Sequence, residues 1–352
     1  MANATIAVLS GARLRTWAIV ASLSLLLVLF ATYSITIGRY DIAMVDVWRI
    51  VWDNVVPAET PSWTPVQADV VEVIRLPRIL AALLIGAGLS ISGAALQGLF
   101  RNPLIDPSII GVTSGAAFGG TLAILVVGGG YPVLGAAFAF GIGSLLAVRA
   151  LASVKGRTST LTLVLAGVVV ASFFGAAISI VKLLADPQQK LPAITYWLMG
   201  SIAATNHRDL ALMALAIVPP SLVILLLRYQ INILSLGEDK ARALGSPIET
   251  VQWTIFVAVS FISAGVVATS GIVGWVGLVI PHMARTLVGP DHGRLLPVSA
   301  LIGAIYLLLV DNIARTATVA ELPIGIITSL IGVPVFALIL RRTRSSSGWT
   351  HD

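Results

Sequence analysis

The side chains that carry most enzyme chemistry are sparse in this chain and form no catalytic group. The four histidines, at 207, 282, 292 and 351, are scattered, and no H-E-x-x-H run occurs. The chain has no cysteine, which excludes disulfides, thiolate metal sites and thiol catalysis. The nucleotide-binding pattern G-x-x-x-x-G-K-[ST] is also missing, because the run at 155–158 lacks the upstream glycine. We therefore predict no catalytic residue, no metal site and no cofactor in this chain, and no ATP hydrolysis by it.

Three arginines beside apolar runs could recognise an anion. Arg75 and Arg78 flank Pro77, which suits the first turn of a helix, and Arg315 follows Asp311 by one helical turn. A guanidinium binds a carboxylate through two parallel hydrogen bonds, so Arg75 and Arg315 are candidates for two docking points for an external partner. Contact with lipid phosphates is the alternative for Arg75 and Arg78, and an i,i+4 ion pair with Asp311 is the alternative for Arg315.

A polar cluster between two apolar runs has the composition of a short helix outside the hydrocarbon. Ser235 and Glu238 have capping-box spacing, and Gly245 ahead of Pro247 would end the helix. Acidic residues come first and basic residues later, as the helix dipole favours. This segment could receive force from a cytoplasmic partner or be an ordinary solvated loop helix; it comprises Leu236, Gly237, Glu238, Asp239, Lys240, Ala241, Arg242, Ala243, Leu244 and Gly245.

Two prolines shape a second polar segment, the inner loop at residues 101–107. Pro103 and Pro107 bar a continuous helix there, because the residue before a proline avoids the α region. A stiff loop of this kind could close a pathway, although it could also be a simple turn.

The composition predicts an all-α polytopic integral membrane protein. Hydrophobic residues make up 57% of the chain and charged residues 11%, against about 25% charged in soluble domains. A helix needs about 20 apolar residues to cross the hydrocarbon. Without long linkers, one domain over residues 1–352 is expected. About ten transmembrane helices are predicted, at residues 17–37, 79–99, 109–128, 132–152, 161–183, 210–230, 250–269, 271–288, 295–313 and 323–341.

The charge distribution predicts the orientation. With both termini in the cytoplasm, 14 of the 22 Lys and Arg residues and 6 of the 16 Asp and Glu residues lie on the inner side. The positive-inside rule therefore places both termini and residues 236–245 in the cytoplasm. The basic balance then reflects orientation and anionic lipid, and nucleic acid is not expected as a partner.

The apolar segments themselves carry two further signals. The run at 79–99 has small-xxx-small spacing at Gly86–Ser90 and Gly88–Ser92, which favours close helix packing. Away from the segment ends, no Asp, Glu, Lys or Arg interrupts the predicted spans, and proton-coupled carriers usually need such groups. A sodium-coupled carrier is not excluded.

Several runs together resemble the FecCD-like permeases of bacterial ABC importers, the group that serves iron–siderophore complexes, haem and cobalamin. They keep their order along residues 70–340. The matching runs are 75–78, 92–97, 102–107, 111–115, 196–200, 236–245, 277–282 and 321–325.

The resemblance implies a type II importer permease in the cell inner membrane that works as a homodimer, or with a close paralogue, around a shared path. It also implies two cytoplasmic ATPase subunits that bind ATP and magnesium, and a periplasmic or lipid-anchored substrate-binding protein. Residues 236–245 would be the coupling helix that enters the ATPase, and Arg75 and Arg315 would meet acidic residues of the binding protein. Asn102 and Leu104 would belong to the cytoplasmic gate, with the hydroxyls at 158–160, including Thr160, as a second gate element.

Three classes of function stay in competition. The first is a permease subunit that imports an iron complex, a ferric siderophore or haem, with cobalamin or a molybdate-type oxyanion as alternatives. The second is an ion-coupled secondary transporter that works alone, and the third is a structural membrane subunit. The polar segment 236–245, together with the absence of mid-membrane carboxylates, favours the first class over the second.

Overall fold

The computed structural model describes residues 2–53, 56, 62–152 and 160–346, and this part of the chain forms helices and no strand. The helices are α1 (Ala2–Thr36), α2 (Met44–Asp53), α3 (Pro65–Asp69), the π-helix η1 (Val70–Arg75), α4 (Leu76–Phe100), the 3₁₀ helix η2 (Pro107–Ile110), α5 (Val112–Val126), α6 (Tyr131–Ala152), α7 (Thr160–Leu184), α8 (Lys190–Leu198), α9 (His207–Leu226), α10 (Arg228–Ser235), α11 (Glu238–Ala243), α12 (Ile248–Ser270), α13 (Val276–Val288), α14 (His292–Thr316) and α15 (Ile324–Ser346).

Each of the ten predicted apolar segments corresponds to one of these helices. Seven helical stretches, containing α1, α4, α6, α7, α9, α12 and α14, are long and apolar enough to cross a membrane. The other three, α5, α13 and the apolar part of α15 (Ile324–Ile339), are shorter apolar helices. The predicted all-α polytopic fold is thus confirmed for the described residues.

Helix α4 is the centre of the molecule, and small residues let its neighbours approach closely. A Cβ atom on Gly86 would lie 2.1 Å from the Gly303 carbonyl oxygen of α14, and one on Gly93 would lie 1.8 Å from the Gly277 carbonyl oxygen of α13. These distances are too short for any side chain, so backbone meets backbone at both crossings. The small-residue pattern of the second apolar segment is therefore a packing signal.

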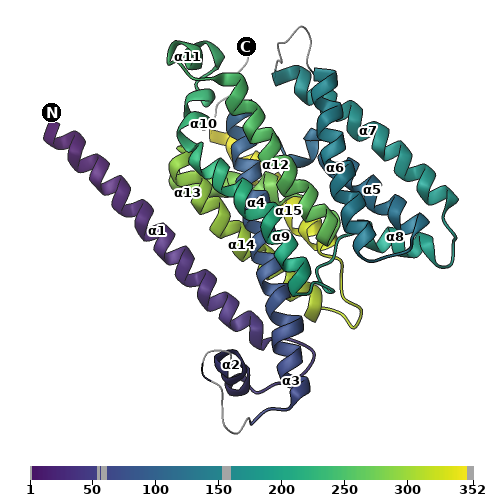
Figure 1. Cartoon of the computed structure of the whole chain (residues 1–352). Coiled ribbons are helices and arrows are strands. Elements are labelled where there is room, and N and C mark those ends of the chain that lie inside the picture. Colours follow the sequence, from purple (N-terminus) through teal and green to yellow (C-terminus); the bar gives the residue numbers. More distant parts are fainter. Residues whose placement is uncertain (1, 54–55, 57–61, 153–159, 347–352) are drawn as a thin grey trace.

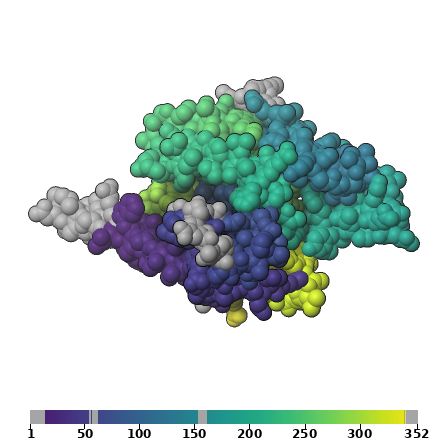
Figure 2. Space-filling model, turned by 60° about the horizontal axis from the view of Figure 1, so that its bottom comes forward, coloured from purple at the N-terminus to yellow at the C-terminus, as the bar shows by residue number. Residues whose placement is uncertain are grey.

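The remaining helices surround α4 unevenly (Figure 1). Helices α9, α12, α13 and α14 pack around it, and α5 to α8 form a group on one side. Helix α1 leans away from the body, and α2 and α3 lie at the end opposite α10 and α11. In keeping with the predicted orientation, we name the α2–α3 end the outer end and the α10–α11 end the inner end. Figure 2, with the outer end turned forward, shows the purple and blue N-terminal helices over its middle and the teal helices to one side.

The eighth segment differs from its predicted bounds of 271–288. Helix α13 begins only at Val276, after a non-helical stretch at 271–275. Gly271 (φ 70°) and Trp275 (φ 70°) are both left-handed there, a conformation that interrupts a helix. The run is glycine-rich but apolar throughout, so its hydrophobicity does not mark the break.

Candidate functional site

A buried ion-pair network joins α4, α14 and the 317–323 turn at the outer end. Arg78 Nε donates to Asp311 Oδ1 at 2.8 Å, and Arg78 Nη1 donates to the Glu321 carboxylate at 2.9 and 3.0 Å. The side chains of Arg78 and Asp311 are almost fully buried. Asp311 also pairs with Arg315 at 3.8 Å, which confirms the i,i+4 pair suggested by their spacing.

The other two arginines bond mainly to the end of α1. Arg75 donates to the carbonyl oxygens of Ile35 (2.9 Å), Thr36 (3.2 Å) and Tyr40 (2.6 Å). Arg315 Nη2 donates to the Ser34 carbonyl oxygen at 2.6 Å and to the Asn312 side-chain oxygen. Both arginines therefore tie the outer end of α1 to the central helices.

The two residues expected to be docking points, Arg75 and Arg315, lie at one place in the structure. Arg75 is 4% exposed and Arg315 5% exposed, so neither projects from the outer face or reaches toward lipid headgroups. Instead they line one cavity of about 180 Å³, the arginine cavity, together with Arg39, Arg78 and Glu321. Four guanidinium groups stand against two carboxylates, Glu321 in the lining and the buried Asp311 behind it, which leaves an excess of positive charge that suits an incoming carboxylate.

At the inner end, α11 is shorter than predicted and is capped differently. The capping box between Ser235 and Glu238 is wrong: Ser235 is the last residue of α10, and its hydroxyl donates to the Asn232 carbonyl oxygen at 2.6 Å. Gly237, at φ 108°, takes the N-cap position instead, because the turn between α10 and α11 needs a left-handed residue.

The end of α11 agrees with the sequence. Gly245 is left-handed (φ 73°), and the Ser246 amide donates to the Ala241 carbonyl oxygen in a Schellman arrangement. Ala241 is fully buried, whereas Leu236 and Leu244 are exposed. The segment thus presents two apolar side chains among charges outside the hydrocarbon, which is the character of a protein-contact surface.

The inner loop at 101–107 is a fixed turn, as its prolines predicted. The Leu104 amide donates to Asn102 Oδ1 at 2.9 Å, and the Ser108 amide donates to Asp106 Oδ1 at 2.9 Å. Leu104 is 49% exposed and Asn102 is exposed, so both predicted gate residues are accessible in one chain. Of the second predicted gate element, residues 158 and 159 lie outside the described residues, and Thr160 is the first residue of α7.

Sequence reasoning missed the side chains that connect these pieces. Gln97 Nε2, buried in α4, donates to the carbonyl oxygens of Ile105 (3.5 Å), Gly277 (3.3 Å) and Leu278 (3.2 Å). A Cβ on Gly237 would lie 3.2 Å from Arg101 Nη1, so the side chain of Arg101, the first residue of the inner loop, reaches the start of α11. This side chain connects the predicted gate loop to the predicted coupling segment.

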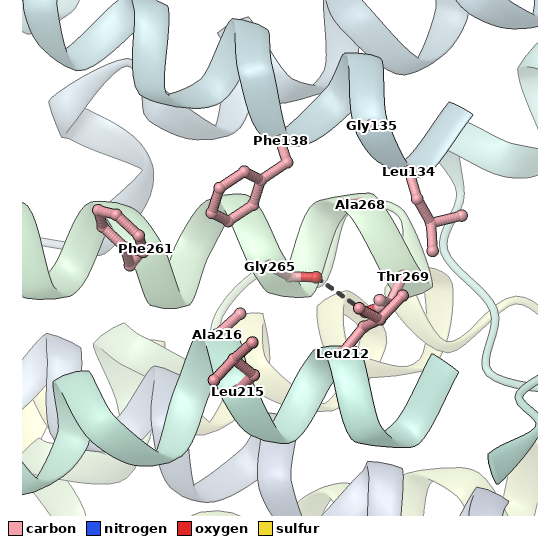
Figure 3. A pocket seen from close by; sticks show the side chains of 10 residues that line it. All are labelled: Leu134, Gly135, Phe138, Leu212, Leu215, Ala216, Phe261, Gly265, Ala268 and Thr269. Carbon is pink, nitrogen blue, oxygen red and sulfur yellow. Dashed lines mark hydrogen bonds between the residues drawn. The ribbon is translucent and has the colours of Figure 1, made fainter. Parts of the chain in front are cut away.

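Apolar residues line several hollows in the surface. One of about 670 Å³ lies between α9 and α12, and there are two others of similar character. One, of about 410 Å³, lies between α6, α9 and α12, and Figure 3 shows Phe138, Leu215 and Phe261 around it. Its one drawn hydrogen bond, from the Thr269 hydroxyl to the Gly265 carbonyl oxygen (2.8 Å), stays within α12. The other, of about 540 Å³, lies between the end of α8, the non-helical stretch 271–275 and α15. Neither offers a polar cluster for a metal, and no group of three His, Cys, Asp or Glu side chains converges within the described residues.

The match to a known family covers nearly all of these elements. The model of the FecCD transport family matches residues 25–342. The chain belongs to the FecCD transport family. It is accordingly an ABC importer permease, and the helices from α2 to α14, the outer arginines and residues 236–245 fall within the matched range, which begins inside α1 and ends inside α15.

Relatives of this FecCD permease differ in the substrate for which they are named. The chain is 43% identical over 322 residues to the molybdate import system permease protein MolB of Haemophilus influenzae, covering 92% of this chain and 95% of that one. It is 43% identical over 271 residues to an iron chelatin transport system permease protein of Helicobacter pylori, covering 77% and 82%. A solved structure, described as the inward-facing conformation of a metal-chelate type ABC transporter, superposes with a TM-score of 0.82 at 42% identity and covers 92% of this chain and 99% of its own.

Proposed function

We propose that this permease is driven by ATP that a separate cytoplasmic ATPase subunit binds with magnesium and hydrolyses. The observation that carries the proposal is the position of α11. This polar helix lies beyond the apolar helices at the inner end, beside the inner loop and opposite the arginine cavity. The inner end carries a surface that could bind an ATPase and an accessible loop, and the outer end carries a cavity that could accept an anion. This arrangement suits an importer that connects an ATPase to an external binding protein.

The exposed part of residues 236–245 is the proposed ATPase contact. Leu236 and Leu244 would enter an apolar recess of the partner, surrounded by the charges of α11. By the positive-inside rule, this end faces the cytoplasm and both termini lie there, in the cell inner membrane.

The arginine cavity is the proposed docking point for the periplasmic or lipid-anchored binding protein. An acidic side chain of that protein would enter between Arg75, Arg78 and Arg315, with Arg39 at the exposed edge. One cavity per chain means that two copies of the permease, as homodimer or paralogue pair, would offer two such points.

The second copy is proposed to cover the apolar sides of α7 and α15. Both helices expose rows of large apolar side chains, among them Leu165, Phe173, Leu330 and Val333. The 540 Å³ hollow beside α15 would then face a shared path that ends at the inner loop. In this arrangement Asn102 and Leu104 form the cytoplasmic gate.

For the substrate, we propose a metal-containing compound, with an iron chelate (a ferric siderophore or haem) as the first candidate. Molybdate is the second candidate, and the specific support for it is the 43% identity to the molybdate permease across 92% of this chain. Uptake of radioactive iron in siderophore and haem form, measured beside radioactive molybdate in the same vesicles, separates the two.

Reconstitution tests the proposed energy source. Vesicles that hold the permease with its ATPase and binding protein should concentrate substrate when ATP is supplied on the ATPase side, without an ion gradient. Uptake by the permease alone, driven by a sodium or proton gradient, would instead identify a secondary carrier. A complex that takes up nothing under either condition would support a structural subunit.

A further inference from the structure

One asparagine joins the segment that carries α11 to the central helices. Asn232, in α10, donates from Nδ2 to Asp291 Oδ1 at 2.7 Å. Its Oδ1 accepts from the His292 amide at 2.9 Å and from the His292 ring Nδ1 at 2.8 Å. Since the amide oxygen can only accept, the ring carries its proton on Nδ1. We call Asn232, Asp291 and His292 the amide clasp.

The clasp is anchored at the first turn of α14. Asp291 is the N-cap of that helix, and its Oδ1 also accepts from the Gly293 amide at 3.0 Å. Burial disfavours its charged form, but the hydrogen bonds from Asn232 and the Gly293 amide outweigh that cost, so the pKa of Asp291 is lowered. The carboxylate is therefore ionised at neutral pH, and its bond from Asn232 is charge-assisted and strong.

The amide clasp also contacts α4. The contact is at Gly98, the residue that follows Gln97, which bonds to the inner loop. His292 is buried, and a Cβ on Gly98 would lie 2.3 Å from its Nε2 and 2.7 Å from Cγ2 of Ile231. Helices α4, α10 and α14 thus meet at Gly98. The neighbouring side chain, Gln97, bonds to the inner loop at the Ile105 carbonyl oxygen.

We propose that Asn232 is the positioning residue that makes α10 and α14 move as one body, so that displacement of α11 reaches α4 and the inner loop. The inference rests on the proposed function and names the connection through which it would act. The apolar contacts of Ile231 and Leu234 also hold α10 against the core, but they are non-directional and do not fix its register. Hydrogen bonds to a helix N-terminus do fix it, because they are made only in one alignment.

The first test removes the clasp from the complete complex of permease, ATPase and binding protein in vesicles. Asn232→Leu keeps the side-chain size and removes all three bonds, while Ile231 and Leu234 keep α10 in place. We expect ATPase binding to persist and substrate uptake per ATP hydrolysed to fall about tenfold, a change of about 1.4 kcal/mol in coupling.

Asn206→Leu is the matched control. Asn206 caps α9 at the outer end with bonds to the Arg208 and Asp209 amides, so this change also removes an asparagine cap but not the clasp. Asn206→Leu should leave the ratio of uptake to hydrolysis unchanged. An equal fall in both variants, or no fall in Asn232→Leu, overturns the proposal.

The second test fixes the clasp covalently. Asn232→Cys with Asp291→Cys, in a chain that has no other cysteine, can be joined by a short bifunctional thiol-alkylating reagent, which forms a thioether with each cysteine. If α10 and α14 move together, the cross-linked protein should keep its substrate uptake. Loss of uptake on cross-linking would mean that the two helices must slide past each other, and this would contradict the proposal. Failure of the proposed function itself is distinguishable, because the unsubstituted complex would then show no ATP-driven uptake.

Discussion

Each end of this permease is stabilised by a different kind of polar contact. At the outer end, charged pairs such as Arg78–Asp311 are buried and short, and they join α4 to α14. At the inner end, the amides of Gln97 and Asn232 make the contacts between helices: Gln97 donates to three backbone carbonyl oxygens at 3.2–3.5 Å, and Asn232 bonds to the Asp291 carboxylate and to His292. Breaking a buried charge pair leaves an uncompensated charge and costs about 3–5 kcal/mol, whereas a neutral hydrogen bond contributes about 0.5–1.5 kcal/mol.

This difference indicates which end can rearrange. The outer end is suited to keep its shape while a partner docks, because any change there would expose or orphan charges. At the inner end, the long neutral bonds of Gln97 can be exchanged at small cost, which suits the proposed gate at the inner loop, while the charge-assisted bond of Asn232 keeps α10 on α14.

The largest effect is expected when the outer ion pairs lose their shared carboxylate. Asp311→Ala leaves the buried Arg78 and Arg315 without the carboxylate that they share, and it should lower the free energy of unfolding by about 3–5 kcal/mol. Asp46→Ala, which breaks the exposed pair with Arg49, is the control and should cost at most about 1 kcal/mol. Thermal unfolding in detergent measures both, and similar losses would show that the outer network is not a rigid element.

The next effect concerns the coupling surface. Leu244, 61% exposed, can be changed to Glu without disturbing the core, and we expect ATPase binding to weaken by about 2 kcal/mol or more, as for a central interface anchor. The buried Ala241 is unsuitable for this test, because a charge there would disrupt α11 itself. Val319→Glu makes the same change at the outer end, at a residue 94% exposed. Pull-down of the ATPase should be weakened only by Leu244→Glu; equal binding by both variants would assign residues 236–245 to an ordinary loop helix.

A smaller loss is expected at the inner amide Gln97. Gln97→Leu leaves the Ile105 and Gly277 carbonyl oxygens without this donor and should cost about 1–3 kcal/mol in stability. The inner loop should also become more accessible, which thiol labelling of Leu104→Cys would measure. A destabilisation as large as that of Asp311→Ala would remove the proposed difference between the two ends.

The smallest effect is expected at the end of α11. A Cβ on Gly245 would meet no atom within 4 Å, so Gly245→Ala introduces only left-handed backbone strain of about 1–2 kcal/mol. Affinity for the ATPase should fall modestly. Gly128→Ala, at an outer turn with φ 104° and equally open space, should leave that affinity unchanged.

The sequence predicted the features that belong to single segments. Apolar runs predicted all ten long or apolar helices, and Pro103, Pro107 and Gly245 predicted the turns in which they lie. The exact ends of the helices were harder to predict, because Ser235 fits a capping box as well as it fits the last turn of α10. The break at 271–275 lies inside an apolar run and leaves no hydrophobicity signal.

The pairings between distant segments were not predictable in the same way. Arg78 and Asp311 are 233 residues apart, and Asn232 and Asp291 are 59 apart, so no local spacing connects them. Arg75 and Arg315 were identified as separate anion contacts, yet the packing of η1 and α14 against the end of α1 brings both to one cavity. Side-chain types suggest what a residue can bind, and the fold determines which partner it meets.

We propose that binding of nucleotide to the ATPase displaces residues 236–245 and thereby changes the conformation of the inner loop. Leu104→Cys is then the only cysteine of this chain, and its labelling by a thiol reagent can be followed by mass spectrometry in the complete complex, with and without nucleotide held on the ATPase. We predict that nucleotide changes the labelling rate several-fold in the otherwise unsubstituted permease, and that Asn232→Leu abolishes this response. A labelling rate that is the same with and without nucleotide, in a complex that transports, would contradict the account.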